Sequence, residues 1–108
     1  MLSYAPKPEF PMPNPKQSVE SILHPGKTNQ VDAAKYDAMK TAILAALPSA
    51  PPGLTVADLT SAVKPSLPDT LFPGGSTAGW WVKCVQLDLE AKQVIVRTST
   101  TPLRLRRV

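Results

Sequence analysis

Few residues in this chain are of the types that catalyse reactions, since it holds one histidine and one cysteine. His24 and Cys84 would be a general base and a nucleophile if they met. However, His24 lies in a His-Pro-Gly turn, and Cys84 lies in an apolar row of a predicted helix, where a thiol behaves as a small hydrophobic side chain. Asp88 and Glu90 are two residues apart on that helix and point away from each other, so they form no acid–base pair. We therefore expect that the protein is not an enzyme.

The same residues argue against a metal or a cofactor. One histidine and one cysteine cannot form a metal site of the usual nitrogen and sulfur ligands within a monomer. The run Gly74-Gly75-Ser76-Thr77 offers backbone donors at a helix start, which favours an anion such as a DNA phosphate. A plain turn followed by a helix N-cap is the favoured interpretation, and the run lacks the lysine and spacing of a P-loop. We expect no metal, no cofactor and no small-molecule substrate.

Positive charge is concentrated at the end of the chain. The 12 basic and 8 acidic residues give a net charge of +4, and residues 93–108 contain four arginines and no acid. These are Arg97, Arg104, Arg106 and Arg107. Such a local excess attracts phosphate backbones or acidic protein surfaces. The alternating Leu-Arg pattern of residues 103–106 is also typical of a half-exposed strand, so binding and solvation remain alternatives.

Composition indicates one small folded domain in a reducing compartment. Hydrophobic residues make up 43% and charged residues 19% of the 108 residues, which are values of a globular protein. No segment has the roughly 20 apolar residues that span a bilayer, and Pro6 and Pro8 interrupt the place of a signal peptide. A single cysteine fits a reducing environment. We therefore expect a cytoplasmic protein with no membrane contact.

Proline divides the chain into an N-terminal arm and a folded body. Five of the 13 prolines lie at positions 6, 8, 11, 13 and 15, and each removes a backbone donor and favours an extended neighbour. We expect residues 1–27 to form an extended, polyproline-like arm and residues 28–108 to form the domain. Apolar side chains of the arm, such as Tyr4, Phe10 and Met12, are candidates for docking on an apolar surface.

Two helices are predicted in the first half of the body. The first covers residues 32–47, where apolar residues recur at helical spacing and Pro48 follows. Its stripe consists of Tyr36, Met39, Ile43 and Leu47. The second begins after Thr55, a predicted N-cap, and ends near Pro65. Its expected buried side consists of Leu59, Ala62 and Val63.

A third helix is predicted from Ser76 or Thr77 to Lys92. One row of it consists of Trp81, Val85 and Leu89, and a second apolar row consists of Trp80, Cys84, Leu87 and Ala91. Together the rows cover more than half the circumference, so we expect burial on two sides. The Trp80-Trp81 pair would stack on unpaired bases in a nucleic-acid site. In small domains such residues more often belong to the core or to an interface.

A C-terminal β-hairpin is predicted after this helix. Residues 94–96 are β-branched, residues 103–106 alternate with period two, and residues 99–102 form the loop between them. The pairing would place Leu103 and Leu105 on the core and turn Arg104 and Arg106 outward. Three helices followed by a hairpin indicate an α+β fold with the element order of a winged helix-turn-helix.

Short motifs support this interpretation by resemblance. The segment from Leu89 to Ile95 resembles the Leu-Glu-x-Lys-Gly-Leu-Ile junction of bacterial winged-helix proteins, with Gln93 where glycine is usual. More narrowly, the body resembles a family of small uncharacterised bacterial proteins. The motifs are Tyr-Asp-Ala-Met at 36–39, Leu-Phe-Pro-Gly-Gly at 71–75 and Gly-Trp-Trp-x-Lys-x-Val-Gln-Leu-Asp-Leu-Glu at 79–90. This family resemblance implies a fold and no established activity.

A winged-helix fold implies DNA binding, with the third helix in the major groove and the hairpin along phosphates. The candidate residues are Thr77, Lys83 and Gln86 on the helix and Arg97, Arg104 and Arg106 on the wing. Against this, Asp88 and Glu90 offset two lysines of the helix, and the spacer of residues 65–75 is longer than a standard turn.

Two functions therefore remain open at the level of sequence. The first is a DNA-binding, transcriptional-regulator-like protein that acts on double-stranded DNA as a dimer, because one small module supplies limited contact area. The second is a protein-interaction or self-association module on the same scaffold without nucleic acid. In that case Trp80, Leu87 and the arm would form the interface, and a homodimer is the partner to test.

Overall fold

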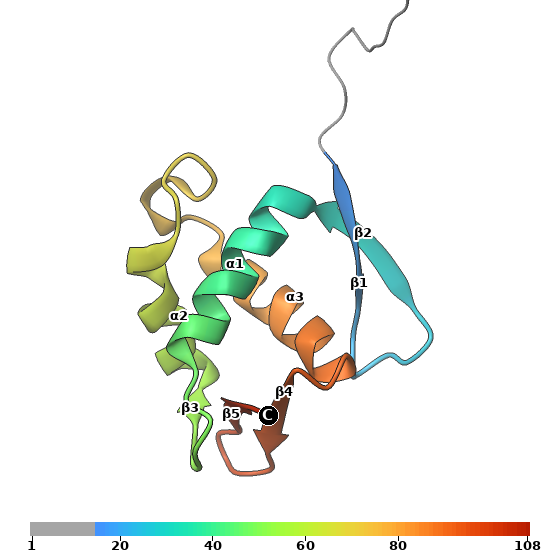
Figure 1. Cartoon of the computed structure of the whole chain (residues 1–108), viewed down its shortest axis with the longest axis vertical. Coiled ribbons are helices and arrows are strands. Elements are labelled where there is room, and N and C mark those ends of the chain that lie inside the picture. The colour runs from blue at the N-terminus through green and yellow to red at the C-terminus, as the bar shows by residue number, and fades with distance from the viewer. Residues whose placement is uncertain (1–14) are drawn as a thin grey trace, which may run out of the picture.

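The computed structural model describes residues 15–108, and this part of the chain folds into three α-helices and two small antiparallel sheets (Figure 1). The helices are α1 (Ala33–Ala46), α2 (Val56–Val63) and α3 (Ala78–Ala91). One sheet pairs β1 (Lys16–Glu20) with β2 (Thr28–Asp32). The other has the order β3 (Leu54–Thr55), β5 (Arg104–Arg107), β4 (Ile95–Thr98). The predicted α+β class is confirmed.

The predicted apolar stripe of the first helix forms the centre of the core. α1 begins at Asp32, whose Oδ1 accepts a hydrogen bond from the Lys35 amide at 3.0 Å. It ends at Leu47, where Pro48 prevents a further turn. All four stripe residues, Tyr36, Met39, Ile43 and Leu47, are buried as predicted.

The second helix begins where the sequence predicts. The Thr55 hydroxyl oxygen accepts a hydrogen bond from the Asp58 amide at 3.1 Å. Leu59 and Val63 are buried against the core, whereas Ala62 is exposed, so its predicted place on the buried side was wrong. Pro65 falls in a short 3-10 helix (Lys64–Ser66) that ends the segment.

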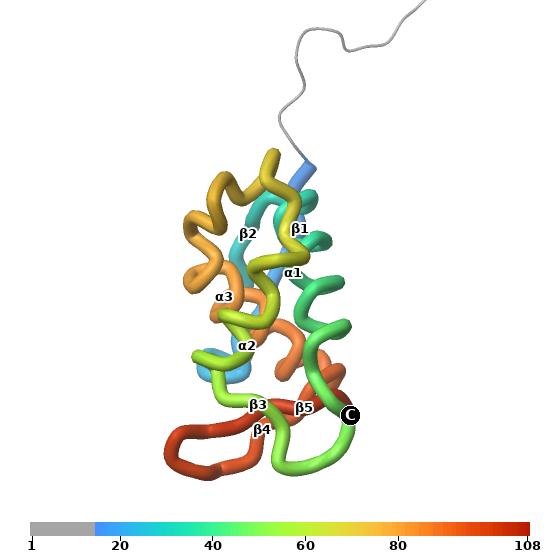
Figure 2. The backbone as a smooth tube through the Cα atoms, turned by 90° about the vertical axis from the view of Figure 1, so that its left-hand side faces the viewer, coloured from blue at the N-terminus to red at the C-terminus, as the bar shows by residue number. Residues whose placement is uncertain are grey.

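The third helix lies between the other two helices and the β1–β2 hairpin (Figures 1 and 2). Its first row, Trp81, Val85 and Leu89, is buried as predicted, and Phe72 meets Trp81 edge to face. The second row is covered unevenly, because Cys84, Leu87 and Ala91 are half-buried while Trp80 is exposed. α3 ends at Ala91, and Gln93, two residues further on, adopts φ of +62°, the left-handed conformation that the glycine of the related junction adopts readily.

The β1–β2 hairpin was not predicted, and it crosses the boundary drawn at residue 27 between arm and domain. Its register pairs Lys16 with Asp32 and Glu20 with Thr28. Val19 enters the core, and the Ile22 amide donates to the Leu87 carbonyl of α3 at 3.3 Å. Residues 15–27 are thus part of the folded body. The arm predicted for residues 1–14 lies outside the described residues, as do the docking candidates Tyr4, Phe10 and Met12.

The three-stranded sheet closes one end of the helices (Figure 2). β4 and β5 form the predicted antiparallel hairpin, and β3 adds to it through the pairing of Leu54 with Leu105. Leu105 is fully buried and Leu103 packs at the edge of the core, as predicted. Gly53 approaches β5 so closely that a Cβ atom there would lie 2.2 Å from the Leu105 carbonyl oxygen.

Candidate functional site

Arg104 and Arg106 lie on the outer face of the three-stranded sheet, because they alternate with the buried Leu105. The Arg104 guanidinium donates to the Gly53 carbonyl at 3.1 Å, and Arg107 donates to the Leu47 carbonyl at 2.8 Å. Both acceptors are neutral, so these hydrogen bonds leave the positive charges uncompensated. Within residues 15–108, Arg106 makes no ion pair. The outer face of β5 is therefore basic.

Arg97 does not belong to this basic face. It pairs with Leu105 in the sheet register and so points inward. Its Nε lies 2.5 Å from Oε1 of Glu90, its Nη2 donates to Oε2 at 3.0 Å, and the Glu90 side chain is only 1% exposed. The hydrogen bond to Glu90 raises the pKa of Arg97, although partial burial opposes the rise. Arg97, a candidate for contact with phosphates, is therefore turned inward, and its charge is paired with a buried carboxylate.

Gln86 is also unavailable to a ligand in solution. Its side chain is 1% exposed, and its Nε2 donates to Oε2 of Glu90 at 2.7 Å. Its Oε1 is buried without a hydrogen-bond partner among the described residues. Gln86, a candidate for contact with the major groove, is therefore buried and positions Glu90 inside the protein.

The other candidates on α3 lie on the surface. Thr77 and Lys83 are exposed, and the Thr77 hydroxyl donates to the Ser76 carbonyl at 2.6 Å instead of capping the helix. Thr77 is separated from the wing arginines by the length of α3, about 20 Å at 1.5 Å per residue. Trp80 is 59% exposed and packs edge-on against Trp81, while Leu87 is half-buried beside the β1–β2 hairpin.

The glycine turn before α3 has its donors occupied. The Gly74 amide donates to Oδ1 of Asp69 at 2.9 Å, and the amides of Gly75 and Ser76 donate to the carbonyls of Phe72 and Pro73. The anion at this turn is thus the carboxylate of Asp69.

Asp88 is a buried anchor that sequence reasoning did not identify. It accepts hydrogen bonds from the Tyr36 hydroxyl, from the Glu20 amide at 2.9 Å and from Nζ of Lys92 at 2.9 Å. Burial, followed by the hydrogen bond to Asp88, raises the pKa of Tyr36. The carboxylate therefore joins α3 to α1 and to β1. The spacing of Asp88 and Lys92, four residues on one helix, was the available signal.

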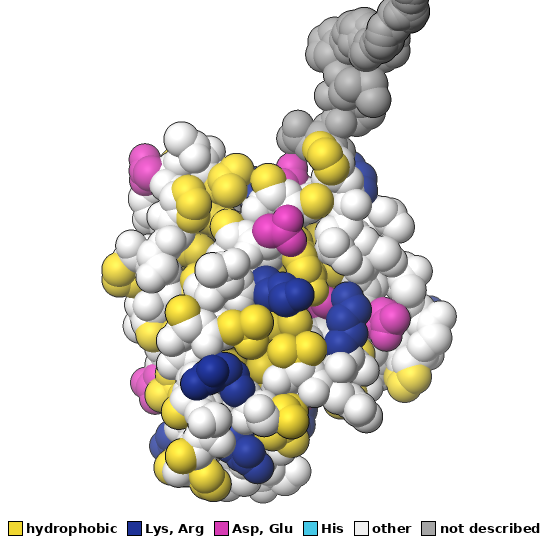
Figure 3. Space-filling view, in the orientation of Figure 1, with side chains coloured by type: hydrophobic (Ala, Val, Ile, Leu, Met, Phe, Trp, Pro, Cys, Tyr) yellow, Lys and Arg dark blue, Asp and Glu magenta, His cyan; other side chains and the backbone are white. Residues whose placement is uncertain are grey.

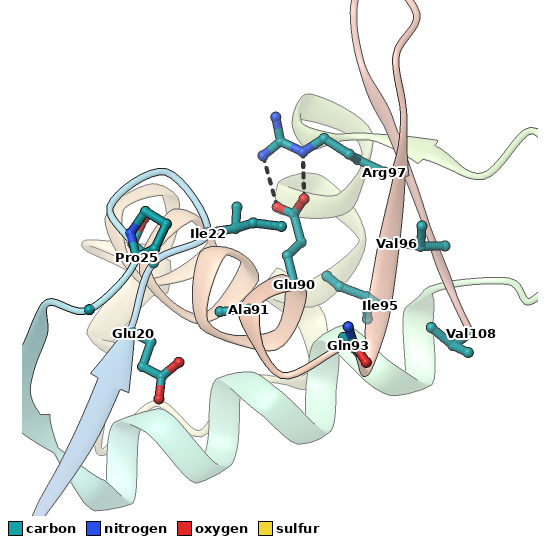
Figure 4. Close-up of a pocket in the computed structure, with 12 residues that line it drawn as sticks. Glu20, Ile22, Pro25, Glu90, Ala91, Gln93, Ile95, Val96, Arg97 and Val108 are labelled. Carbon is teal, nitrogen blue, oxygen red and sulfur yellow. Dashed lines mark hydrogen bonds and ion pairs between the residues drawn. The ribbon is translucent and has the colours of Figure 1, made fainter.

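A pocket of about 650 Å³ opens between the β1–β2 loop, the end of α3 and β4 (Figure 4). Its apolar lining consists of Ile22, Pro25, Ala91, Ile95, Val96 and Val108. Figure 4 shows the Glu90–Arg97 ion pair beside these side chains, linking α3 to β4. The volume lies in the range of ligand sites, about 300–1,000 Å³. No sequence pattern pointed to this pocket, because its wall from residues 20–26 depends on the hairpin that was not predicted.

The backbone of β4 has a free edge along this pocket. The Val108 amide donates to the Val94 carbonyl, and hydrogen-bonded pairs alternate in an antiparallel ladder, so Val96 and Thr98 face β5. The amides and carbonyls of Ile95 and Arg97 must then point away from β5. β4 is the last strand of its sheet, and within residues 15–108 no strand pairs with this side.

The described residues contain neither a helix that could span a membrane nor a group of three metal-ligating side chains. These features define a small α+β domain. Its surface has a basic sheet face and an apolar pocket beside the unpaired edge of β4. The chain belongs to a family of unknown function, DUF6958, whose model matches residues 16–105. The match begins at the first residue of β1 and agrees with the expectation of an uncharacterised family. No curated protein and no solved structure matches the chain.

Proposed function

We propose that the protein is a binding module on a winged-helix scaffold, not an enzyme, and that its pocket beside β4 holds a segment of a partner protein. The winged-helix part of the proposal is supported by the element order. α3 leads directly into the β4–β5 hairpin, and β3, from between α1 and α2, pairs with β5. Fold alone does not assign a function, and the surface of the domain provides further support for the proposal.

The observation that carries the proposal is where exposed apolar side chains gather. Among the described residues, the exposed large hydrophobic side chains are Trp80, Ile22, Leu23 and Val108. Ile22, 41% exposed, and Val108, 77% exposed, line the pocket, and Leu23 follows Ile22 in the same loop. Exposed apolar groups concentrated at a concave site favour an interaction surface.

A peptide selection tests this proposal. Random 12-residue peptides are displayed against the full chain, and the peptides that bind are synthesised and measured by fluorescence anisotropy. The Ile22→Asp variant should weaken their binding by about tenfold or more. Burying one such side chain contributes about 1.5–3 kcal/mol, and 1.4 kcal/mol corresponds to a factor of ten.

Leu23→Asp is the matched control, because Leu23 is the exposed neighbour of Ile22 and does not line the pocket. Its effect on peptide affinity should be less than threefold. The pocket would be excluded as the interaction site if Ile22→Asp and Leu23→Asp changed the peptide affinity by the same factor, or if the selection yielded no binder.

Double-stranded DNA is a second candidate partner, and one observation favours it. Arg104 and Arg106 occupy one outer face without a carboxylate partner, and Lys83 is exposed on α3. Gln86 and Arg97 no longer contribute, so the positive surface is smaller than the sequence suggests. This candidate is tested by the salt dependence of duplex binding, argued below.

A further inference from the structure

We infer that the occupant of the pocket is an extended acidic segment of a partner protein that pairs with the free edge of β4 as an added strand. This inference rests on the proposed function and gives the chemistry and geometry of the partner. It follows from three features: unpaired backbone groups, an adjacent apolar pocket and a basic outer face.

Two residues of β4 have backbone groups that pair with no strand among residues 15–108. Ile95 and Arg97 direct their amides and carbonyls away from β5, two residues apart, which is the spacing that an added strand requires. Natural sheets protect such edges with lysine, proline or a bulge. β4 has the sequence Ile-Val-Arg-Thr, with neither lysine nor proline, and its one cation turns inward to Glu90. Arg97 is half-buried and Ile95 is only 2% exposed, so an added strand would reach the backbone groups of Arg97 directly and those of Ile95 only if the pocket wall moves aside.

The pocket provides for the side chains of an added strand. A strand beside β4 would lie about 4.8 Å away, with alternate side chains on opposite faces. Those on the inner face would meet Ile22, Pro25 and Ala91 across the pocket. Because these walls are apolar, every second residue of the partner segment should be apolar.

The remaining side chains of the segment would face the other way, on the side of Val96 and Arg106. These two residues are opposite each other in the register and share the outer face. Arg104 lies on the same face, and neither arginine has a carboxylate partner among residues 15–108. Both arginines lie on β5, two strand spacings or about 10 Å from the added strand, so they would attract acidic residues at its outward positions mainly at low ionic strength. The one acid on the far wall, Glu20, lies at the end of β1.

The same charge argues against a second copy of this chain as the occupant. A β4–β4 pairing would place the two sets of Arg104 and Arg106 on one continuous sheet face, three strand spacings or about 14 Å apart, so their like charges would add a weak, salt-screened repulsion. Each chain also carries a net charge of +4. A partner segment with alternating apolar and acidic residues meets neither penalty.

The test uses the full chain and a synthetic peptide from the selection described above. The selected sequences should alternate apolar and acidic residues. Peptides are N-methylated at every second residue, in each of the two possible registers. In one register the affinity should fall at least tenfold, and in the other it should stay within threefold of the unmodified peptide. Strand pairing uses the amides on one side of the peptide only.

Hydrogen exchange of single amides provides the second readout. The Arg97 amide should exchange at least tenfold more slowly with bound peptide, whereas Ile95 is already only 2% exposed in the free chain and should change less. The Val96 amide, which faces β5, is the internal control and should be slow in both states. Ile22-dependent binding that tolerates N-methylation in both registers and leaves the Arg97 amide unprotected would overturn strand addition and leave the proposed function standing.

Two other results would also overturn the inference. If no selected peptide depends on Ile22, the proposed function fails and strand addition fails with it. If light scattering shows a dimer in which Ile95 and Arg97 are protected without peptide, the edge is taken by a second copy of the chain.

Discussion

Asp88 and Glu90 are two residues apart on α3, so their side chains leave the helix about 200° apart and reach different layers of the protein. Asp88 meets Tyr36 and the amide of Glu20, whereas Glu90 meets Arg97 from β4. Each buried carboxylate has a cation partner and further donors, as buried charges require. Asp88 and Glu90, whose negative charges argue against a nucleic-acid role for the helix at the level of sequence, are therefore internal structural groups.

The Glu90–Arg97 pair gives a prediction about stability. Arg97→Met should reduce the free energy of unfolding by about 3 kcal/mol, the lower part of the range for breaking a buried ion pair, because part of Arg97 remains in water. Urea denaturation followed by circular dichroism measures the loss.

The double variant Glu90→Leu with Arg97→Met is the control. Replacing both partners by apolar side chains should recover more than half of the loss, because no unpaired carboxylate stays buried. If Arg97→Met were as stable as the wild type, the burial of the Glu90 carboxylate would not depend on its ion pair with Arg97.

At the scale of elements, patterns within one segment were sufficient for most of the fold. The stripe from Tyr36 to Leu47, the Thr55 cap and the Leu-Arg alternation each specify a helix or a strand through local spacing, and all three are confirmed. Gln86 shows the limit of such reasoning. The sequence predicts an exposed position, but Gln86 is buried and donates to Glu90, one turn further along α3, which in turn binds Arg97 of β4.

The β1–β2 hairpin was missed for a physical reason. β2 has the sequence Thr-Asn-Gln-Val-Asp, and its first three residues are exposed, so it has no clear alternation of apolar and polar residues. The strand pairing is specified by contacts across the sequence, from Val19 to the core and from Glu20 to Asp88. The pocket depends on this hairpin, so it was equally hidden.

Cys84 offers a measure of how firmly this hairpin is docked, because Cys84 and residues of the β1–β2 loop line a common shallow pocket. Burial raises the pKa of the Cys84 thiol, with a smaller contribution from Asp88, so its reaction with a disulfide reagent at neutral pH should be slower than that of free cysteine. Val19→Ala should speed the reaction roughly tenfold, because losing two buried carbons costs about 1.6 kcal/mol and favours local opening.

Val56→Ala is the matched control for this measurement. Val56 is half-buried at the start of α2 and belongs to neither the hairpin nor α3, so the Cys84 rate should stay within threefold of the wild type. Equal acceleration by both variants would mean that Cys84 becomes accessible through global unfolding.

At the scale of the whole molecule, internal pairing determines where the net charge lies. Lys92 and Arg97 are paired with Asp88 and Glu90 inside or at the edge of the protein. In the face shown in Figure 3, basic side chains predominate over the lower part, around the three-stranded sheet. The excess charge is therefore presented by one end of the molecule, beside the pocket, where it suits an acidic peptide or a phosphate backbone.

Salt dependence distinguishes these two ligands. If duplex DNA binds the sheet face, the logarithm of its affinity should fall linearly with the logarithm of salt concentration, and Arg106→Ala should reduce the slope by about 1. Fluorescence anisotropy with a 20-base-pair duplex measures both quantities. Lys16→Ala removes the same charge at the start of β1, at the other end of the molecule (Figure 1), and should leave the slope unchanged. If Arg106→Ala and Lys16→Ala reduced the slope equally, the attraction would depend on net charge alone. If no duplex bound at low salt, DNA would be excluded as a partner.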